Sequence, residues 1–212
     1  MADIFDDRFD NVDVKVSDNL IAKGEDINIT AKDPTMANLV IGVGWTLNAF
    51  DADTLDLDVS CFLLDKNGKT RKNEDFVFYN NLQDEDESIV HNGDNLTGAG
   101  DGDDESISIN LQGIPFDILK VMFVFSIYRG EEKDQNLSQV RSPYIRVINA
   151  SNSYELIRYD LAADAAEMKD TAVLVASLNR EGPKWHFEAI GEAVEGGLSA
   201  IATGYDIIIH EG

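Results

Sequence analysis

The segment LDLDVSCFLLDKNGK, residues 55–69, predicts a strand that ends in a turn. Residues 55–64 are mostly apolar, with branched and aromatic side chains that favour an extended backbone. The next residues include Asn67-Gly68, a pair that favours a tight hairpin turn. We therefore predict a β-hairpin with Leu55–Leu64 as its first strand and a return strand after the turn.

Stretches with the same alternating or β-branched character recur along the chain, at intervals typical of antiparallel sheets. Besides Leu55–Leu64, they are Val12–Val16, Asp26–Ile29, Leu39–Trp45, Phe76–Tyr79, Ser106–Leu111, Lys120–Tyr128, Tyr144–Asn149, Ser153–Tyr159, Thr171–Leu178 and Trp185–Ile190. Leu161–Lys169 and Gly197–Thr203 favour short helices. The sequence thus predicts an all-β fold, mainly an antiparallel β-sandwich, with two or three short helices. We expect a single domain over residues 12–212, preceded by an acidic extension over residues 1–11.

The composition fits a globular domain that interacts with cations. With 212 residues, of which 43% are hydrophobic, the chain is long enough to bury a core. Its 40 acidic and 17 basic residues give a formal net charge of −23. This charge disfavours binding to nucleic acid or to an anionic membrane surface. Because bound cations would relieve the self-repulsion of the chain, we expect cations as the first class of ligand.

The sequence also predicts whether disulfides form and where in the cell the protein is located. Cys61 is the only cysteine, so an internal disulfide is excluded, and its apolar neighbours predict a buried thiol. The first residues, MADIFDDRFD, do not resemble a signal peptide. The longest apolar run, Val121–Phe125, is too short to span a bilayer. We expect a cytoplasmic protein without an integral membrane segment.

The acidic residues are concentrated in one part of the chain. No lysine or arginine lies between Lys72 and Lys120. Within that stretch, HNGDNLTGAGDGDDE, residues 91–105, holds five carboxylates and four glycines. A solvated acidic surface usually intersperses basic residues, because like charges close in sequence destabilise one another. The local excess therefore points to a bound cation.

The oxygen atoms of residues 91–105 match the ligands that Ca²⁺ prefers, which are carboxylates, amides, backbone carbonyls and water. The candidate ligands in this segment are Asp94, Asn95, Asp101, Asp103, Asp104 and Glu105. Its glycines let the backbone turn its carbonyl groups towards an ion. The segment does not match the helix-flanked calcium loop, because Leu96 and Ala99 stand where that motif needs an oxygen ligand and a glycine. We therefore expect a second segment to supply further ligands.

The second group of ligands is predicted at the start of the first strand. Asp56 and Asp58 are two residues apart, so in a strand both carboxylates point to the same side. Two carboxylates held this close raise each other's pKa unless a cation lies between them. Asn80 and Asn81 follow another predicted strand and add neutral amide oxygens. A solvent-facing strand edge explains the aspartate pair equally well, and a flexible acidic loop is the alternative for the glycine-rich segment.

Other chemistries find less support. His91, His186 and His210 lie far apart and lack the spacing of zinc ligands, so structural or surface roles are expected. The sequence has neither a glycine-lysine phosphate loop nor a nucleophile elbow. Glycoside hydrolysis needs one carboxyl group held neutral in an apolar site, which a glycine-rich acidic loop does not provide. Arg141 and Arg146 are expected to pair with acids on a sheet surface. We therefore expect none of these chemistries.

Six segments, taken together and in order, resemble the bacterial TerD family of tellurium-resistance and general-stress proteins. They are GVGW (Gly42–Trp45), LDLDVSCFLL (Leu55–Leu64), DFVFYNNL (Asp75–Leu82), HNGDNLTGAGDGDDE (His91–Glu105), QNLSQVRSPYIRVIN (Gln135–Asn149) and RYDL (Arg158–Leu161). The resemblance covers nearly the whole chain after about Val16. It implies a calcium-binding β-sandwich in which the segment of Asp56 and Asp58 and the acidic loop together hold two or more Ca²⁺ ions.

The resemblance also implies a role in tellurite resistance and the stress response, with other tellurium-resistance or stress proteins as partners. Thr46 stands where family members usually carry an aspartate, which leaves one carboxylate fewer near the expected site. Our first hypothesis is a calcium-binding, non-enzymatic stress-response protein in which the ion orders the acidic loop and regulates partner binding. The alternative is an acidic interaction or assembly module in which metal is incidental. An enzyme that uses a bound metal to activate water is the third hypothesis.

Overall fold

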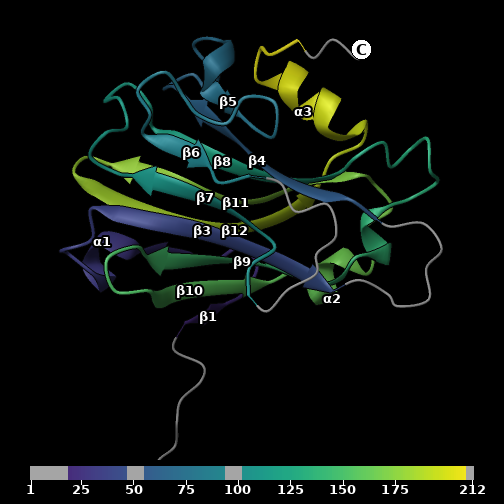
Figure 1. The fold of residues 1–212 in the computed structure, drawn as a ribbon, viewed down its shortest axis with the longest axis horizontal. Helices are drawn as coiled ribbons and strands as arrows, with labels where there is room; N and C mark the ends of the chain where they lie inside the picture. The colour runs from purple at the N-terminus through teal and green to yellow at the C-terminus, as the bar shows by residue number, and fades with distance from the viewer. Residues whose placement is uncertain (1–18, 47–54, 94–101, 209–212) are drawn as a thin grey trace, which may run out of the picture.

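The computed structural model describes residues 19–46, 55–93 and 102–208. They form two six-stranded sheets packed into a sandwich (Figure 1). Sheet A has the strand order β1-β10-β9-β3-β7-β6, and sheet B has the order β2-β12-β11-β8-β4-β5. All strand pairs are antiparallel except β1 with β10. The predicted all-β, mainly antiparallel fold is confirmed.

The strands and helices have the following bounds. Sheet A contains β1 (Leu20–Ile21), β3 (Asn38–Thr46), β6 (Ile89–His91), β7 (Glu105–Asn110), β9 (Arg141–Asn149) and β10 (Tyr154–Asp160). Sheet B contains β2 (Asp26–Asn28), β4 (Leu57–Leu64), β5 (Phe76–Val77), β8 (Lys120–Ile127), β11 (Ala172–Glu181) and β12 (Lys184–Ala193). The short helices are α1 (Ile29–Lys32), α2 (Ala162–Ala165) and α3 (Gly197–Gly204), with 3-10 turns η1 (Asn73–Asp75) and η2 (Leu137–Gln139).

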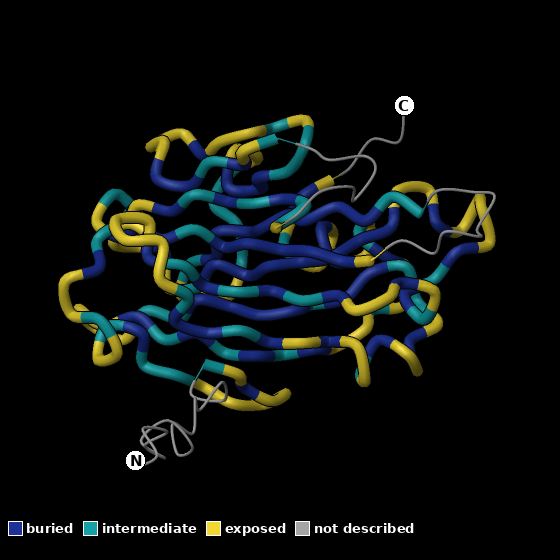
Figure 2. The backbone as a smooth tube through the Cα atoms, turned by 60° about the horizontal axis from the view of Figure 1, so that its bottom comes forward, coloured by how far each residue is buried: buried dark blue, intermediate teal, exposed yellow. Residues whose placement is uncertain are grey.

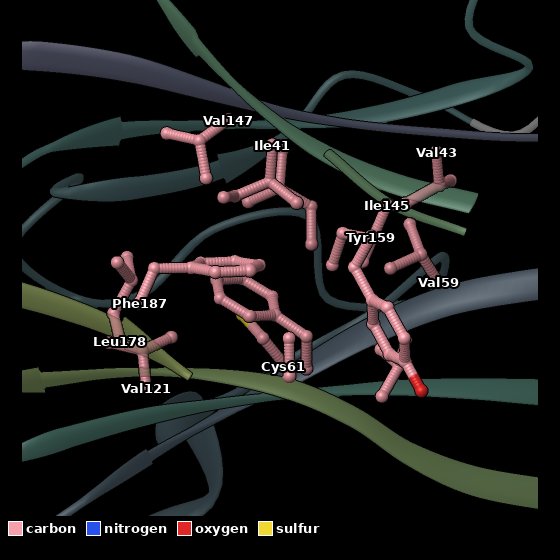
Figure 3. Close-up of a cluster of buried hydrophobic side chains, with 14 of the residues drawn as sticks. Ile41, Val43, Val59, Cys61, Val121, Ile145, Val147, Tyr159, Leu178 and Phe187 are labelled. Atoms are coloured by element: carbon pink, nitrogen blue, oxygen red, sulfur yellow. The ribbon is translucent and has the colours of Figure 1, made fainter. Parts of the chain in front are cut away.

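The main core lies between the two sheets, because alternate residues of each strand point inward. Figure 3 shows side chains of both sheets meeting there, among them Ile41 and Ile145 from sheet A and Cys61 and Phe187 from sheet B. The central strands are buried along most of their length, and exposure is concentrated in the loops (Figure 2). Burial raises the pKa of the Cys61 thiol, as expected for a cysteine that acts as a small apolar residue.

The outer face of sheet B is covered in part by α3, drawn in yellow beside β5 in Figure 1. Phe62 and Leu64 of β4, which point away from the main core, pack with Ile201 and Ala202 of α3 in a second apolar cluster. Both faces of this half of β4 are therefore buried, which explains the unbroken apolar run from Cys61 onwards. No helix in the described part of the chain is long and apolar enough to cross a membrane.

The turn predicted after β4 forms, but the tight hairpin does not. Asp65 accepts the N–H of Asn67 at 2.7 Å, and Gly68 has a φ of +71°, as such a turn requires. The chain then leaves β4, and the N–H of Thr70 donates to the carbonyl oxygen of Tyr205 at 3.2 Å. Only the two residues of β5 return to pair with β4. The long partner of β4 is β8, a pairing distant in sequence that a local turn signal does not reveal.

Other departures from the predicted elements are small. The predicted strand Asp26–Ile29 ends one residue early, because the Asn28 side chain accepts the N–H of Ala31 at 2.8 Å and caps α1. The predicted helix Leu161–Lys169 contains only the single turn of α2. The elements β1, β6 and α1 are too short to show a period in the sequence. The predicted strand Val12–Val16 and the extension over residues 1–11 lie outside the described residues.

Candidate functional site

The acidic segment and the strand with the aspartate pair meet at one end of the sandwich, where β4 and β7 begin. Glu105 is the first residue of β7, and its side chain reaches the backbone of β4. Among the predicted ligands, the structure describes Asp56, Asp58, Asn80, Asn81, Asp103, Asp104 and Glu105. Asp94, Asn95 and Asp101 lie outside the described residues, as does His210.

Glu105 and His91 cross from sheet A to bind the backbone edge of β4. Oε2 of Glu105 accepts the N–H of Val59 at 2.8 Å, and Nε2 of His91 lies 3.1 Å from the carbonyl oxygen of Val59. Nδ1 of His91 accepts the N–H of Gly93 at 3.2 Å, so this pattern assigns the ring proton to Nε2. Both side chains are only 1% exposed. Together the two side chains pair with the backbone N–H and carbonyl groups of Val59, as a neighbouring strand would. The Glu105 carboxylate therefore lies at the amide of the residue after Asp58.

Asp104 extends the pairing of β3 with β7. Its N–H donates to the carbonyl oxygen of Val43 at 2.8 Å, and its Oδ2 accepts the N–H of Trp45 at 2.8 Å. Burial raises the pKa of the Asp104 carboxyl, and the charge of Asp103 raises it further against the opposing effect of the Trp45 N–H. Asp104 therefore holds the end of β3 in place.

Asp103 lies on the outer face of sheet A in a cluster of polar side chains. Its Oδ1 accepts from Nε of Arg146 at 2.8 Å and from the hydroxyl of Tyr144 at 2.9 Å. These contacts depend on Gly42, because a Cβ at that position would lie 2.0 Å from Oδ2 of Asp103. Gly44 makes the same kind of room for Tyr144, because a Cβ on Gly44 would lie 2.5 Å from the tyrosine ring. The expectation that Arg146 pairs with an acid on a sheet surface is confirmed.

Asp58 opens onto a cavity on the outer face of sheet B. The residue is 7% exposed. The cavity has a volume of about 950 Å³, and its lining includes Asp58, Tyr79, Asn80 and Asn81. Burial raises the pKa of the Tyr79 hydroxyl, and the negative charges of Asp58 and, more weakly, Asp56 raise it further. Of the two aspartates, Asp58 lines this cavity and Asp56 does not, and the expectation that both face the same side of the strand stays a prediction.

Basic residues at the border of the acidic stretch return to pair with acids inside it. Arg71 contacts Asp75 at 2.7 Å and Asp117 at 2.9 Å, and Lys72 contacts Glu85. Part of the local charge is therefore neutralised by the protein itself. The contacts with Asp117 and Glu85 join residues distant in the chain, so the spacing of charges in the sequence does not reveal them.

The turn of residues 84–87 is anchored by its first carboxylate. Asp84 is 2% exposed, and its Oδ1 accepts the N–H of Ile89 at 2.7 Å. Its Oδ2 accepts the hydroxyl of Ser88 at 2.9 Å. The other three residues of the turn are exposed. Asp84 is thus a structural cap of the turn that leads into β6.

Among the predicted ligands that the structure describes, Asp58, Asn80 and Asn81 line one cavity. Within them, no three or more histidine, cysteine, aspartate or glutamate side chains form a group that could hold a metal ion. Asp103, Asp104 and Glu105 each bind different groups of the protein, as described above. Asp58, Asn80 and Asn81 share one cavity wall and present the oxygen donors that Ca²⁺ prefers. The Nδ2 of Asn81 donates to the carbonyl oxygen of Phe76 at 2.7 Å, so a cation in this cavity would have to use Oδ1.

Two features of this region were not recognised from the sequence. The alternating glycines 42 and 44 were treated as part of a strand, although glycine within a strand often marks a close approach of another group. That signal could have indicated that side chains lie directly over β3. The contact of His91 with β4 had no comparable local signal, because its partner is 32 residues away in the chain.

The fold and its acid-rich end define a class of protein, the acidic β-sandwich described by the TerD domain. The TerD domain model matches residues 19–205, and the chain belongs to the TerD family. The family resemblance stated from the sequence is thereby confirmed.

Relatives in sequence and solved structures agree with this assignment. General stress protein 16U of Bacillus subtilis is 44% identical over 188 residues, covering 88% of this chain and 96% of that protein. Tellurium resistance protein TerD of Serratia marcescens is 41% identical over 187 residues, with the same coverage of 88% and 96%. The crystal structure of a telluride resistance protein (TerD) homologue from Streptomyces coelicolor A3(2) superimposes with a TM-score of 0.61 at 18% identity. It covers 79% of this chain and 95% of that one, and shows the same fold.

Proposed function

We propose that this chain is a calcium-binding, non-enzymatic protein of the stress response. The observation that carries the proposal is the hydrogen bond from the Val59 N–H to Glu105, because it joins the acidic segment to the strand of the aspartate pair. Two carboxylate-bearing segments that are far apart in sequence thus meet at one end of the fold. A Ca²⁺ ion bound between the two segments would neutralise their charge and order the acidic loop.

Asp56 and Asp58 are the ligands that we propose first. Asp58 is a nearly buried carboxylate at a cavity wall, where a bound cation would offset the cost of holding a charge away from water. Asn80 and Asn81 would add neutral oxygens from the same wall. The ligand roles of Asp94, Asn95, Asp101, Asp103, Asp104 and Glu105 stay predictions. Two or more ions per chain are expected, because the candidate ligands lie in more than one group.

The biological setting of the proposal comes from the relatives. Those named above are a general stress protein and a tellurium resistance protein. We propose the same setting for this chain, with a cytoplasmic location and with other stress or tellurium-resistance proteins as partners. Calcium would regulate these contacts by changing the charge of the acidic end.

Calorimetric titration of the metal-stripped protein with Ca²⁺ tests the proposal. At a free Ca²⁺ concentration a hundredfold above the dissociation constant, binding stabilises the fold by about 2.7 kcal/mol. For a domain of this size, that free energy raises the midpoint of thermal unfolding by roughly 5–10 °C. An unchanged midpoint in millimolar Ca²⁺ would refute calcium binding.

Matched variants assign the site. Asp58→Asn keeps the size of the side chain and removes its charge, so it is expected to weaken the calcium-dependent shift. Asp26→Asn is the control, because this side chain is 46% exposed and lies on β2, at the opposite edge of sheet B from β5. Equal shifts in both variants would show that calcium does not use Asp58.

The alternative function, an acidic interaction module, has its own support in the −23 net charge. It predicts a complex with a basic partner that weakens with salt, because screening acts on exposed charges. Such a complex would survive a chelator, whereas a calcium-regulated complex would not. Pull-downs from the same extract with and without chelator therefore separate the two functions.

A further inference from the structure

The cavity beside Asp58 has an aromatic wall that calcium binding does not use. Phe62 and Phe76 stack with ring centroids 4.3 Å apart, and Phe76 and Phe78 stack at the same 4.3 Å. Tyr79 continues the row edge-on to Phe78 at 5.2 Å, and Tyr128 stands edge-on to Tyr79 at 6.1 Å. Four of these rings, those of Phe76, Phe78, Tyr79 and Tyr128, line the cavity.

The cavity is also strongly acidic. Its lining contains the carboxylates of Asp58, Glu74, Glu131 and Glu132 against one guanidinium, that of Arg129, so the lining charges sum to −3. Arg129 lies at the rim, 3.9 Å from Glu132. Asp58 is the most buried of the four carboxylates, and its charge acts on the Tyr79 hydroxyl. The cavity that holds this nearly buried carboxylate is therefore lined by an aromatic ring as well.

Two of the protein's own cations lie over one ring of the aromatic wall, that of Tyr128. The guanidinium of Arg129 lies 5.4 Å from the centre of the Tyr128 ring, and the ammonium of Lys133 lies 5.7 Å from it. Both distances are within the range of a cation–π contact. One ring of the wall is thus already a platform for an ammonium and a guanidinium group.

We propose that this cavity is a binding site for a small aliphatic amine in its protonated form. Its ammonium group would pair with Asp58 beside the ring of Tyr79, and its methylene chain would lie against the half-buried ring of Phe78. The volume of about 950 Å³ lies in the range of small-molecule sites, which are apolar with a few placed polar groups. The inference goes beyond calcium binding and does not depend on it.

An organic amine fits this wall better than a metal ion does. A hard divalent ion takes oxygen ligands and holds its water tightly, so the faces of aromatic rings offer it little. An alkylammonium ion can replace its water by a carboxylate and an aromatic face, while its chain gains from burial against apolar rings. The aromatic row therefore discriminates between the two kinds of cation, although both would contact Asp58.

Calorimetric titration of the full chain with 1,5-diaminopentane tests the proposal. The titration is done at about 0.15 M salt, which screens unspecific attraction to the acidic surface, and 1,5-pentanediol serves as the neutral match. We expect saturable binding of the diamine at one site and no binding of the diol. A second titration uses Nα-acetyl-lysine amide, which keeps the side-chain ammonium group of lysine. It distinguishes a small free amine from a protein side chain as the ligand. Tighter binding of the diamine supports the proposal, and tighter binding of the lysine compound overturns the assignment to a small molecule.

Two variants localise the binding. Tyr79→Leu removes the ring and is expected to weaken diamine binding about tenfold, with calcium binding unchanged. Tyr154→Leu is the matched control, because this tyrosine is 60% exposed on β10 and should leave diamine binding unchanged. Thermal unfolding of both variants confirms that they are folded. Absence of saturable diamine binding, or equal losses in the two variants, overturns the proposal. Neither result bears on the calcium titration, so the two proposals fail separately.

Discussion

The contact of Asp103 with Gly42 provides a sharp test of how the acidic segment is held on sheet A. We consider Gly42→Ala, the smallest change that fills the space above β3. A Cβ at this position would lie 2.0 Å from Oδ2 and 2.5 Å from Cγ of Asp103, so the carboxylate must move. Moving it breaks the contacts with Nε of Arg146 at 2.8 Å and with the Tyr144 hydroxyl at 2.9 Å.

The size of the effect follows from those two contacts. A hydrogen bond to a charged group contributes about 1.5–3 kcal/mol to stability. The side chains of Asp103 and Arg146 are 14% and 25% exposed, so water replaces part of what is lost. We therefore expect Gly42→Ala to lower the free energy of unfolding by about 2 kcal/mol. The midpoint of thermal unfolding should fall by roughly 4–8 °C.

Urea unfolding of a double-mutant cycle is the assay. If the clash with the carboxylate causes the loss, Gly42→Ala should cost almost nothing in an Asp103→Ala background. Gly204→Ala is the control, because nothing lies within 4 Å of a Cβ placed there. An unchanged cost of Gly42→Ala in the absence of Asp103 would show that this reasoning is wrong.

Three further outcomes are expected. Glu105→Ala should cost about 1–3 kcal/mol, measured by urea unfolding, because it leaves the buried Val59 N–H without its acceptor. Stability should fall as pH rises from about 10 towards 12. Burial and the hydrogen bond to Asp103 raise the pKa of Tyr144 from 10.0 to about 12 in the folded protein. Between these pH values the tyrosine therefore ionises only in the unfolded chain, which favours unfolding. Unfolding at stepped pH tests the sign, and Tyr144→Phe should reduce the loss. Cys61 should react with a thiol reagent only after unfolding, because it is buried and its pKa is raised; rapid labelling of the native protein would contradict this.

The fold was largely predictable because its signals are local. Strands β3, β8, β9 and β12 carry alternating or branched apolar residues, and their predicted positions agree with the structure to within a few residues. The hairpin after β4 was confirmed only in part, because the return strand β5 pairs with β4 over two residues. Its turn residues were read correctly, but Thr70 bonds to Tyr205 near the end of α3 and draws the chain away.

The candidate site was predictable in composition and only partly in arrangement. The sequence identified Asp58 and Glu105 as members of two acidic groups and expected them to meet. It did not indicate that Glu105 binds a backbone amide or that the wall beside Asp58 is aromatic. Both facts depend on which strands are neighbours. The order of the strands in a sheet produces no periodic pattern in the sequence.

By itself, the sequence determined the strands, the turns, the acidic character and the family, because each of these depends on side chains that lie close together along the chain. Only the tertiary structure decided that β8 lies beside β4, that Arg146 neutralises Asp103, and that Glu105 binds the edge of β4. The partners in the last two contacts are 43 and 46 residues apart. Such contacts form when the whole core packs, and their energy depends on burial that no local stretch possesses.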